Sequence, residues 1–337
     1  MSGGVDSSVT AAILKERYCQ IIGITMLLHP GQDKDVVESA KKIADKLNIP
    51  IHTVDFSKLF EQRVITPFCN EYRQGRTPNP CIYCNNHIKF DVLLEGAKQL
   101  GADFLATGHY ARVINSTNGY QLLKGVDQSK DQSYFLYKLG QQQLENLLFP
   151  LGFLFKWQTK KIANKLGLAN SVRPESQDVC FIPDGNYSSF VTKFAQPTPG
   201  DIIDTDGKIL GKHKGLPCYT IGQRQGLGLT SDRRLYVIRL DTEKNMVIVG
   251  GQEHLLADNL TANQLSWVSG QPPLDEINDI TARIRYRSPE IEVSLDINQG
   301  NAEVQFKQPQ QAVAPGQSIV FYRGDFVLGG GVIESSR

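Results

Sequence analysis

Residues 2–8 read Ser2-Gly3-Gly4-Val5-Asp6-Ser7-Ser8, and this stretch decides the fold of the chain. Its two glycines let the backbone approach a ligand without a Cβ in the way. The aspartate and serines that follow favour the start of a helix, whose apolar body runs from Val9 to Leu14. A glycine loop that leads into a helix presents free N–H groups and the positive end of the helix dipole, which suits a phosphate. The run matches neither GxxxxGK[ST] nor GxGxxG, so it is not a Walker or Rossmann loop.

The first half of the chain alternates strand and helix patterns. Continuous apolar runs predict strands buried on both faces, and apolar residues at helical spacing predict the helices between them. Strands separated by helices of this length indicate an α/β fold with a doubly wound parallel sheet. The expected strands cover 21–28, 51–54 and 104–107, and the expected helices cover 35–47, 59–73 and 86–100.

The pattern SGGxDS resembles the PP-loop of the ATP-pyrophosphatase superfamily, whose members split ATP between the α and β phosphates. The alternative is an ordinary capped helix, which seven matched positions disfavour. A PP-loop normally follows a strand, yet no strand precedes Met1. We expect the true start to lie upstream, because loss of a central strand would expose the edges of its neighbours.

The second half has a different character. Pro197, Pro199 and Gly200 indicate a linker, and short β patterns follow it. From about residue 261 one strand pattern succeeds another, which predicts a small barrel. We therefore expect three domains: a PP-loop catalytic α/β domain (1–195), a small mainly β central domain (196–260) and a C-terminal β-barrel (261–337).

Bulk properties exclude several classes of protein. Thirty-six Lys and Arg against 35 Asp and Glu leave a net charge of +1, so any RNA-binding surface must be a local patch. No apolar run approaches the roughly 18 residues of a membrane span, and there is no signal peptide. Six cysteines are too few for a secreted disulfide framework. We expect a cytoplasmic protein without membrane partners, in which cysteines act as thiols or metal ligands.

Cysteine gives the second strong signal. Cys81-Ile82-Tyr83-Cys84 follows two prolines, and Asn85 or Asn86 is expected to cap the helix behind it. A cysteine just before a helix has a stabilised thiolate, so its pKa should fall. A third candidate is Cys180, in a loop expected to lead into a strand. Cys19, Cys69 and Cys218 fit a packing role better.

Metal binding is the alternative role for these cysteines. A structural zinc site would need a second close pair of ligands, and the chain has none. Cys81, Cys84 and Cys180 could instead hold a [4Fe–4S] cluster with one open iron.

Taken together, the motifs resemble the bacterial tRNA-specific 2-thiouridylases (the MnmA/TrmU family). The resemblance covers the chain except for the absent first strand. It rests on the PP-loop, on Asn79-Pro80-x-x-Cys84-Asn85, on Cys180-Phe181-Ile182, and on 106–110, 130–136, 222–228, 315–318 and 328–331.

The resemblance implies ATP-dependent 2-thiolation of the wobble uridine in a tRNA anticodon, with Mg²⁺. ATP adenylates the uridine 2-oxygen, and a persulfide then delivers sulfur to C2. By motif position Cys180 carries the persulfide and Cys84 is the catalytic nucleophile. Attack by Cys84 on the Cys180 sulfur leaves a Cys84–Cys180 disulfide. In a variant of this mechanism, Cys84 first releases hydrosulfide from the persulfide. The partners implied are tRNA, a persulfide donor (a cysteine desulfurase or relay protein) and a disulfide reductant.

Cys81 is a departure from the family pattern, because some members carry an acidic residue there. A thiol transfers protons less well at neutral pH, which favours an auxiliary or cluster-ligand role.

The resemblance also implies contact residues. Some of these residues also have an ordinary structural explanation. Met26 fits core packing, His109 fits a hydrogen-bonded loop residue, and 130–132 fit the solvated start of a helix. The run Arg283-x-Arg285-Tyr286-Arg287 fits the charged outer face of a strand. For ATP the implied residues are Ser2, Gly3, Gly4, Val5, Asp6, Ser7, Ser8, Met26 and Gly108. For tRNA they are Asn79, Pro80, Cys81, His109, Lys130, Asp131, Gln132, Arg285, Tyr286 and Gln317.

Two other functions fit parts of the sequence. A PP-loop amide-forming synthetase acting on a small metabolite would need neither the cysteine pair nor the barrel. A non-catalytic RNA-binding protein would not need the intact phosphate loop.

Overall fold

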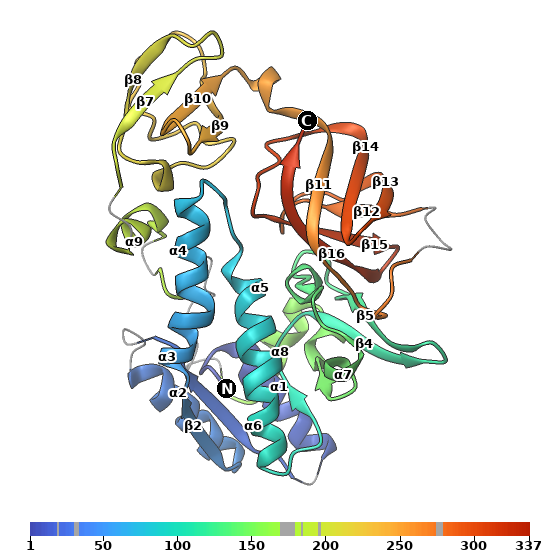
Figure 1. The fold of residues 1–337 in the computed structure, drawn as a ribbon. Coiled ribbons are helices and arrows are strands. Elements are labelled where there is room, and N and C mark those ends of the chain that lie inside the picture. Colours follow the sequence, from blue (N-terminus) through green and yellow to red (C-terminus); the bar gives the residue numbers. More distant parts are fainter. Residues whose placement is uncertain (19, 30–33, 169–178, 183–184, 195–196, 274–278) are drawn as a thin grey trace.

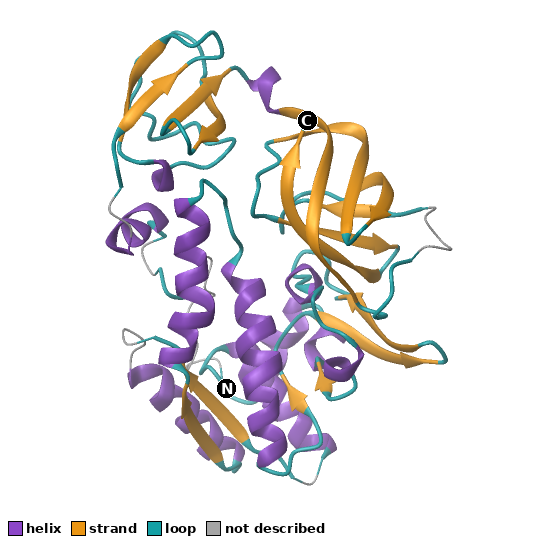
Figure 2. Cartoon of the chain, viewed as in Figure 1, coloured by secondary structure: helices purple, strands orange, loops and turns teal. Residues whose placement is uncertain are grey.

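A computed structural model describes the chain from residue 1 to residue 337, except for 19, 30–33, 169–178, 183–184, 195–196 and 274–278 (Figure 1). Helices gather in the N-terminal part, and most strands gather in two separate β bodies (Figure 2). No helix among the described residues is long and apolar enough to cross a membrane. Cys19 lies outside the described residues.

The N-terminal part is the predicted α/β layer. It begins with α1 (Val5–Arg17), β1 (Gly23–Leu27), α2 (Lys34–Leu47) and β2 (Ile51–Asp55). Strands β1 and β2 pair in parallel, with Gly23 opposite Ile51. A second parallel pair joins β3 (Leu105–Ala106) to β6 (Leu147–Leu148). This alternation confirms the predicted α/β class.

The two parallel pairs are not hydrogen-bonded to each other within the described residues. Residues on both facing edges, including Ile24 of β1 and Leu105 of β3, line a shared cavity. Met1 lies along β1, where its carbonyl accepts a hydrogen bond of 2.8 Å from Thr25 Oγ1. The strand expected upstream of Met1 stays a prediction.

Two long helical rods rise from this layer toward the β bodies (Figure 1). The first contains α3 (Ser57–Phe60), η1 (Glu61–Ile65) and α4 (Thr66–Arg73); the second contains α5 (Pro80–Cys84), η2 (Asn85–Val92) and α6 (Leu93–Gln99). Segments η1 and η2 are π-helical. Both predicted helices are confirmed. Buried Phe60, Phe68 and Ile88 pack between the rods, together with Cys69, whose predicted packing role is also confirmed.

The start of the second rod differs from the prediction. Asn79 is the N-cap, since its side chain accepts a hydrogen bond of 3.1 Å from Cys81 N, and Pro80 takes the first helical position. Proline is favoured there because its missing N–H would have no partner anyway. The cap predicted at Asn85 or Asn86 is therefore wrong, and Cys81 and Cys84 lie inside the helix.

Shorter elements complete this part of the chain. The helix predicted to open at residues 130–136 is only a 3-10 turn, η3, because buried tyrosine and leucine side chains anchor it in the core. The elements are β4 (Ala111–Ser116), β5 (Gly119–Lys124), η3 (Ser133–Leu136), α7 (Gln141–Leu144), η4 (Pro150–Phe153), α8 (Lys156–Lys165) and α9 (Tyr187–Phe194).

The central body is a small four-stranded sheet with the strand order β8-β7-β10-β9. The predicted β patterns of this region are confirmed. Cys218, predicted on a β segment, instead ends the 3-10 helix η6 and packs at the edge of the core. The elements are β7 (Gly200–Ile203), β8 (Ile209–His213), η6 (Leu216–Cys218), β9 (Tyr236–Asp241), β10 (Met246–Gly250) and η7 (Gln252–Leu255).

The C-terminal body is a closed barrel, as predicted. Its strands follow the order β11-β14-β13-β12-β15-β16, and β16 pairs with β11 to close the ring. Along β13, buried and exposed residues alternate, as expected when one face lines the barrel core. The hairpin β4–β5 extends this sheet beside β16, where Leu123 pairs with Phe326. The strands are β11 (Leu256–Trp267), β12 (Thr281–Arg283), β13 (Ile291–Asn298), β14 (Asn301–Gln311), β15 (Ser318–Arg323) and β16 (Phe326–Ser336).

Candidate active site

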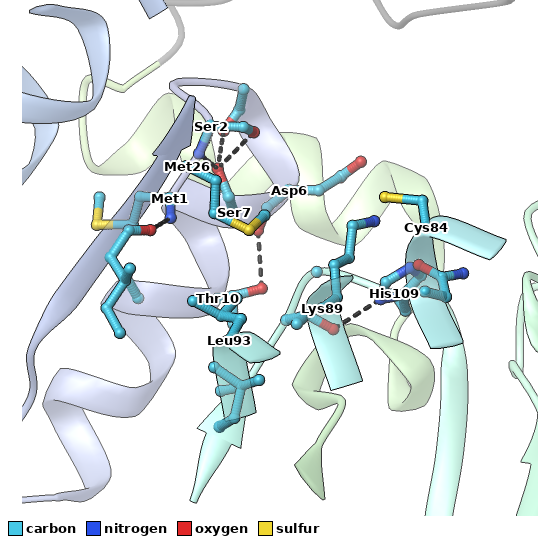
Figure 3. A pocket seen from close by; sticks show the side chains of 18 of the residues that line it. Met1, Ser2, Asp6, Ser7, Thr10, Met26, Cys84, Lys89, Leu93 and His109 are labelled. Carbon is cyan, nitrogen blue, oxygen red and sulfur yellow. Dashed lines mark hydrogen bonds between the residues drawn. The ribbon is translucent and has the colours of Figure 1, made fainter. Parts of the chain in front are cut away.

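One cavity of about 1320 Å³ brings most of the predicted site residues together (Figure 3). The glycine loop and the three cysteines face this same space, although they come from distant parts of the sequence. The predicted residues that line it are Ser2, Gly4, Val5, Asp6, Ser7, Met26, Gly108, Asn79, Pro80, Cys81, Cys84, Cys180, His109, Lys130, Gln132 and Tyr286. Gly3, Ser8, Asp131, Arg285 and Gln317 do not line it.

The glycine loop is braced from within. Gly3 has a φ of +72°, and a Cβ there would lie 2.7 Å from the Ser39 Cβ, so only glycine fits. The Ser7 and Ser8 hydroxyls donate to the Gly4 carbonyl at 3.1 and 2.7 Å. Gly3 and Ser8 therefore shape the loop, while Gly4, Asp6 and Ser7 face the cavity. The first N–H groups of a helix have no intrahelical acceptor, which makes the start of α1 fit an anion.

Gly108 allows β3 to approach the glycine loop closely. A Cβ at this position would lie 3.0 Å from the Asp6 carbonyl carbon and 3.2 Å from Ser7 N. Asp6 itself is held by Lys156 Nζ at 2.8 Å from each carboxylate oxygen, and by the Tyr110 hydroxyl at 3.1 Å. Lys156 was missed by the sequence reasoning, because 150 residues separate it from Asp6.

The three cysteines of the site are reduced and differ in exposure. Cys84 is buried, whereas Cys81 and Cys180 are exposed. Crowding by protein atoms raises the pKa of the Cys81 and Cys84 thiols and raises the pKa of Cys180 to about 12. The lowered pKa expected from the helix start is therefore wrong, because desolvation of the thiolate outweighs the helix terminus.

Cys180 is positioned by its neighbours in the sequence. The Phe181 ring packs edge-on against Phe60 and Phe68, with centroids 5.6 and 5.5 Å apart. Ile182 N donates to Val179 O at 2.9 Å and closes a turn around the cysteine. The strand predicted after Cys180 is absent from residues 179–182, because these apolar side chains anchor a turn in the core. Residues 176–178 of the predicted loop lie outside the described residues.

The described residues contain no group of three His, Cys, Asp or Glu side chains placed to hold a metal ion. Cys81, Cys84 and Cys180, all described, line one cavity without forming such a group. The cluster alternative stays a prediction.

His109 faces the cavity as a neutral ring. Its Nδ1 lies 2.7 Å from Thr107 Oγ1, and the ring packs against Phe90 and Phe149. Burial, together with the nearby charge of Lys89, lowers the pKa of His109 well below its ordinary value. His109 can therefore contact a base or ribose but does not supply a cation for phosphate.

The segment 130–132 has one inward and two cavity-facing residues. Lys130 and Gln132 line the cavity, and Gln132 Oε1 accepts a hydrogen bond of 3.0 Å from Tyr110 N. The Asp131 carboxylate is fully buried, accepts hydrogen bonds from Gly125 and Ser133, and pairs with Arg283 at 3.0 Å. The structure thus places Asp131 in the interior, instead of on a surface that RNA could reach.

The basic run on the barrel divides in the same way. Arg283 points inward to Asp131 and Glu290, so its guanidinium is engaged inside the protein and not on an open strand face. Arg285 is exposed and donates to Gln311 O at 3.1 Å. Tyr286 and Arg287 line the cavity, and the Tyr286 ring lies 4.3 Å from that of Phe135. The barrel therefore presents an aromatic ring and a guanidinium at the cavity.

Comparison with known proteins agrees with this arrangement. Residues 1–184 match the family model described as a tRNA methyl transferase HUP domain, 188–251 the tRNA methyl transferase PRC-barrel domain, and 257–333 the aminomethyltransferase beta-barrel domain. The tRNA-specific 2-thiouridylase MnmA of Halothermothrix orenii is 46% identical over 351 residues, which cover 100% of this chain and 98% of the relative. The protein of the same name from Geobacter metallireducens is 43% identical over 354 residues, which cover 100% and 96%.

The chain belongs to the tRNA-specific 2-thiouridylase (MnmA) family. The domain descriptions mention methyl transfer, whereas the full-length relatives are named for thiolation. The full-length names weigh more, because those alignments cover the whole chain, including the cysteines.

Within this MnmA-family chain the cavity has three further cationic residues that the site predictions did not include. They are Lys89, Lys156 and Arg287, all of which line the cavity. Lys156 acts on Asp6, and Arg287 follows a predicted tRNA contact. Lys89 comes from the π-helical segment η2 and has no counterpart in the predicted site.

Proposed function

We propose that this chain is an ATP-dependent tRNA-uridine 2-sulfurtransferase that converts the wobble uridine of the anticodon to 2-thiouridine, with release of AMP and pyrophosphate. The observation that carries the proposal is the single cavity shared by the glycine loop and the three cysteines. Such a cavity lets one substrate atom be activated at the loop and attacked at the cysteines without leaving the site.

The glycine loop is proposed to hold the ATP phosphates. Support comes from the start of α1, which faces the cavity, and from Gly3 and Gly108, where a side chain would displace the loop. Met26 at the end of β1 is proposed to lie beside the adenine. Mg²⁺ is expected to accompany the phosphates, as it does in phosphoryl and nucleotidyl chemistry. ATP supplies the AMP group that turns the uridine 2-oxygen into a leaving group.

The cysteines are proposed to supply sulfur in two steps. The terminal sulfur of a Cys180 persulfide forms a bond to C2 of the uridine, and the C2–O bond breaks as AMP leaves with the oxygen. The Cys84 thiolate then attacks Cys180 Sγ, and the electron pair of the broken S–S bond stays on the transferred sulfur as the thiocarbonyl. The products are 2-thiouridine and a Cys84–Cys180 disulfide, which a two-electron reductant reopens. A persulfide donor, such as a cysteine desulfurase or relay protein, reloads Cys180.

The tRNA is proposed to reach the cavity between α5, which carries Cys81 and Cys84, and the barrel. Asn79, Pro80, Cys81 and His109 all line the cavity, and Tyr286 offers a ring on which a base can stack. Lys130, Gln132 and Arg285 are proposed to contact the stem. Gln317 lies outside the cavity and is proposed to act on the loop that leads into the helix of Cys81.

The test is mass spectrometry of an anticodon-containing tRNA incubated with the protein, ATP, Mg²⁺ and a persulfide donor. We expect replacement of one oxygen by sulfur at the wobble uridine, loss of this product in Cys84→Ser and Cys180→Ser, and its retention in Cys218→Ser, a cysteine outside the cavity. Absence of the mass change with the unaltered protein refutes the proposal. Activity that survives both cavity substitutions favours an amide-forming synthetase, and failure to release pyrophosphate with tRNA favours a non-catalytic RNA-binding protein.

The cluster alternative needs its own measurement. We expect protein purified without oxygen to be colourless and free of iron and sulfide, and to thiolate tRNA when a persulfide donor is present. Stoichiometric iron and sulfide, lost together with activity on exposure to air, would replace the persulfide mechanism by a cluster mechanism.

A further inference from the structure

Lys89 occupies the cavity without a role in the proposed site. It is partly buried on η2 and lines the cavity between the glycine loop and the cysteines. Among the residues that the structure describes, its ammonium makes no hydrogen bond and no ion pair. The neighbouring cation Lys156 is engaged by Asp6 instead. A partly buried lysine that reaches into a polar cavity without an internal anion is suited to stabilise an anion that forms during the reaction.

The π-helical winding brings Lys89 to the face of the helix that carries Cys84. Five residues separate the two in the sequence. In an α-helix, with about 3.6 residues per turn, such residues are about 1.4 turns apart and lie on different faces. Segment η2 instead has the i to i+5 bonding of a π-helix, seen where Leu93 N donates to Ile88 O, so that residues five apart lie about one turn apart. In Figure 3 both side chains reach into the same part of the cavity, beside Asp6 and His109.

The charge of Lys89 acts on all three thiols of the site. It lowers the pKa of Cys81, Cys84 and Cys180 against the larger, opposing effect of burial. It is the one cation with this effect on Cys84 within the described residues. The other lining residues with charged side chains are Asp6, Asp103, Lys130, Lys156 and Arg287, and the titratable groups of Met1, His29 and His109 also line the cavity.

We propose that Lys89 is the cation that stabilises the Cys84 thiolate, so that Cys84 can attack the Cys180 sulfur and release the transferred sulfur to the uridine. This inference rests on the proposed function for its place in the reaction. In the step it assists, Cys84 has lost its proton, a Cys84–Cys180 bond forms, and the bond from Cys180 to the transferred sulfur breaks. Lys89 gains and loses no proton in this step; it lowers the energy of the sulfur anion.

The experiment compares Lys89→Met, which keeps the aliphatic stem and removes the charge, with Lys89→Arg, which keeps a charge. Lys98→Met is the matched control, because Lys98 is exposed on the same helical rod. Alkylation of Cys84 by iodoacetamide at pH 8 is followed by peptide mass spectrometry, without ATP or tRNA. Removing about one pKa unit of stabilisation lowers the thiolate fraction about tenfold and raises its intrinsic reactivity about threefold. The expected net loss of rate is about threefold.

Lys89→Arg should recover most of this rate, and Lys98→Met should equal the unaltered protein. In thiolation assays Lys89→Met should lower kcat with an unchanged KM for ATP. Equal alkylation rates in Lys89→Met and the unaltered protein, or a raised KM for ATP with unchanged alkylation, overturn the inference. Circular dichroism melting of each variant excludes loss of the fold as the cause.

The alkylation result does not depend on the proposed function. A slowed Cys84 in a protein that never thiolates tRNA would refute the function and keep the charge effect. Normal alkylation in a protein that does thiolate tRNA would refute only the role of Lys89.

Discussion

Gln317 Nε2 donates a hydrogen bond of 2.8 Å to the carbonyl oxygen of Thr77, which joins the barrel to the loop that leads into the helix of Cys81 and Cys84. A second bond lies beside it, because Thr77 N donates to Pro315 O at 2.7 Å. Arg76 adds an ion pair of 3.0 Å to Glu334 of β16. The barrel therefore fixes the segment that leads to Cys81.

We expect Gln317→Met to loosen this segment. The side chain keeps its length but loses the donor, so the free energy of unfolding should fall by about 1 kcal/mol. Hydrogen exchange of the amides from Thr77 to Cys81 should become faster. Gln308→Met, at an exposed position of β14, should change neither measurement. Unchanged exchange in Gln317→Met would show that the bond does not hold the loop.

The buried pair of Asp131 and Arg283 gives a larger effect. The Asp131 side chain is completely buried and Arg283 is 13% exposed, so Asp131→Asn removes one of the two carboxylates that neutralise this guanidinium and leaves Glu290 as the other. We expect a loss of about 3 kcal/mol in the free energy of unfolding, measured by urea denaturation. Asp325→Asn breaks a pair with Arg112 in which the carboxylate is 50% exposed, and should cost less than about 1 kcal/mol. Equal losses in the two variants would contradict the structural role assigned to Asp131.

These contacts show where sequence patterns were sufficient. The glycine loop, the helices expected at 35–47 and 59–73 and the succession of strands in the barrel depend on local periodicity and turn residues, and these were predicted, whereas α8 was not. The cysteines and the loop meet in one cavity because the ends of parallel strands and the helices that follow them converge at one edge of an α/β layer. That convergence follows from the fold class.

The remaining features depend on contacts that no local pattern contains. Arg283 and Asp131 are 152 residues apart, and only the docking of the barrel turns both inward. The π-helical winding of η2 changes which residues share a face with Cys84, so α-helical spacing could not place Lys89 there. The thiol pKa values depend on how closely other atoms surround each sulfur. The cap at Asn79 could have been found, since Asn followed by Pro is a helix-start signal.

We expect Cys180 to react slowly with iodoacetamide although it is exposed. Desolvation by the surrounding protein atoms raises the pKa of Cys180 to about 12, so only about one thiol in ten thousand is ionised at pH 8. After allowing for the greater reactivity of a more basic thiolate, alkylation should be about 50- to 100-fold slower than that of a cysteine thiol with the ordinary pKa of about 8.5. The rate should keep rising with pH from 7 to 10. A rate that levels off below pH 10 would indicate a much lower pKa than this packing produces.

Gly108→Ala tests the close approach of β3 to the glycine loop. The added Cβ would lie 3.0 to 3.2 Å from backbone atoms of Asp6 and Ser7, nearer than the usual contact of about 3.5 to 4.0 Å, so the loop must move. We expect ATP binding, measured by isothermal titration calorimetry, to weaken at least about tenfold, and the free energy of unfolding to fall by about 1 to 3 kcal/mol.

Gly96→Ala is the matched control for Gly108→Ala, because nothing lies within 4 Å of its added Cβ in α6. That variant should bind ATP normally and gain about 0.5 to 1 kcal/mol of stability, since alanine favours the helix. Normal ATP affinity in Gly108→Ala would mean that the nucleotide does not depend on the shape of this loop.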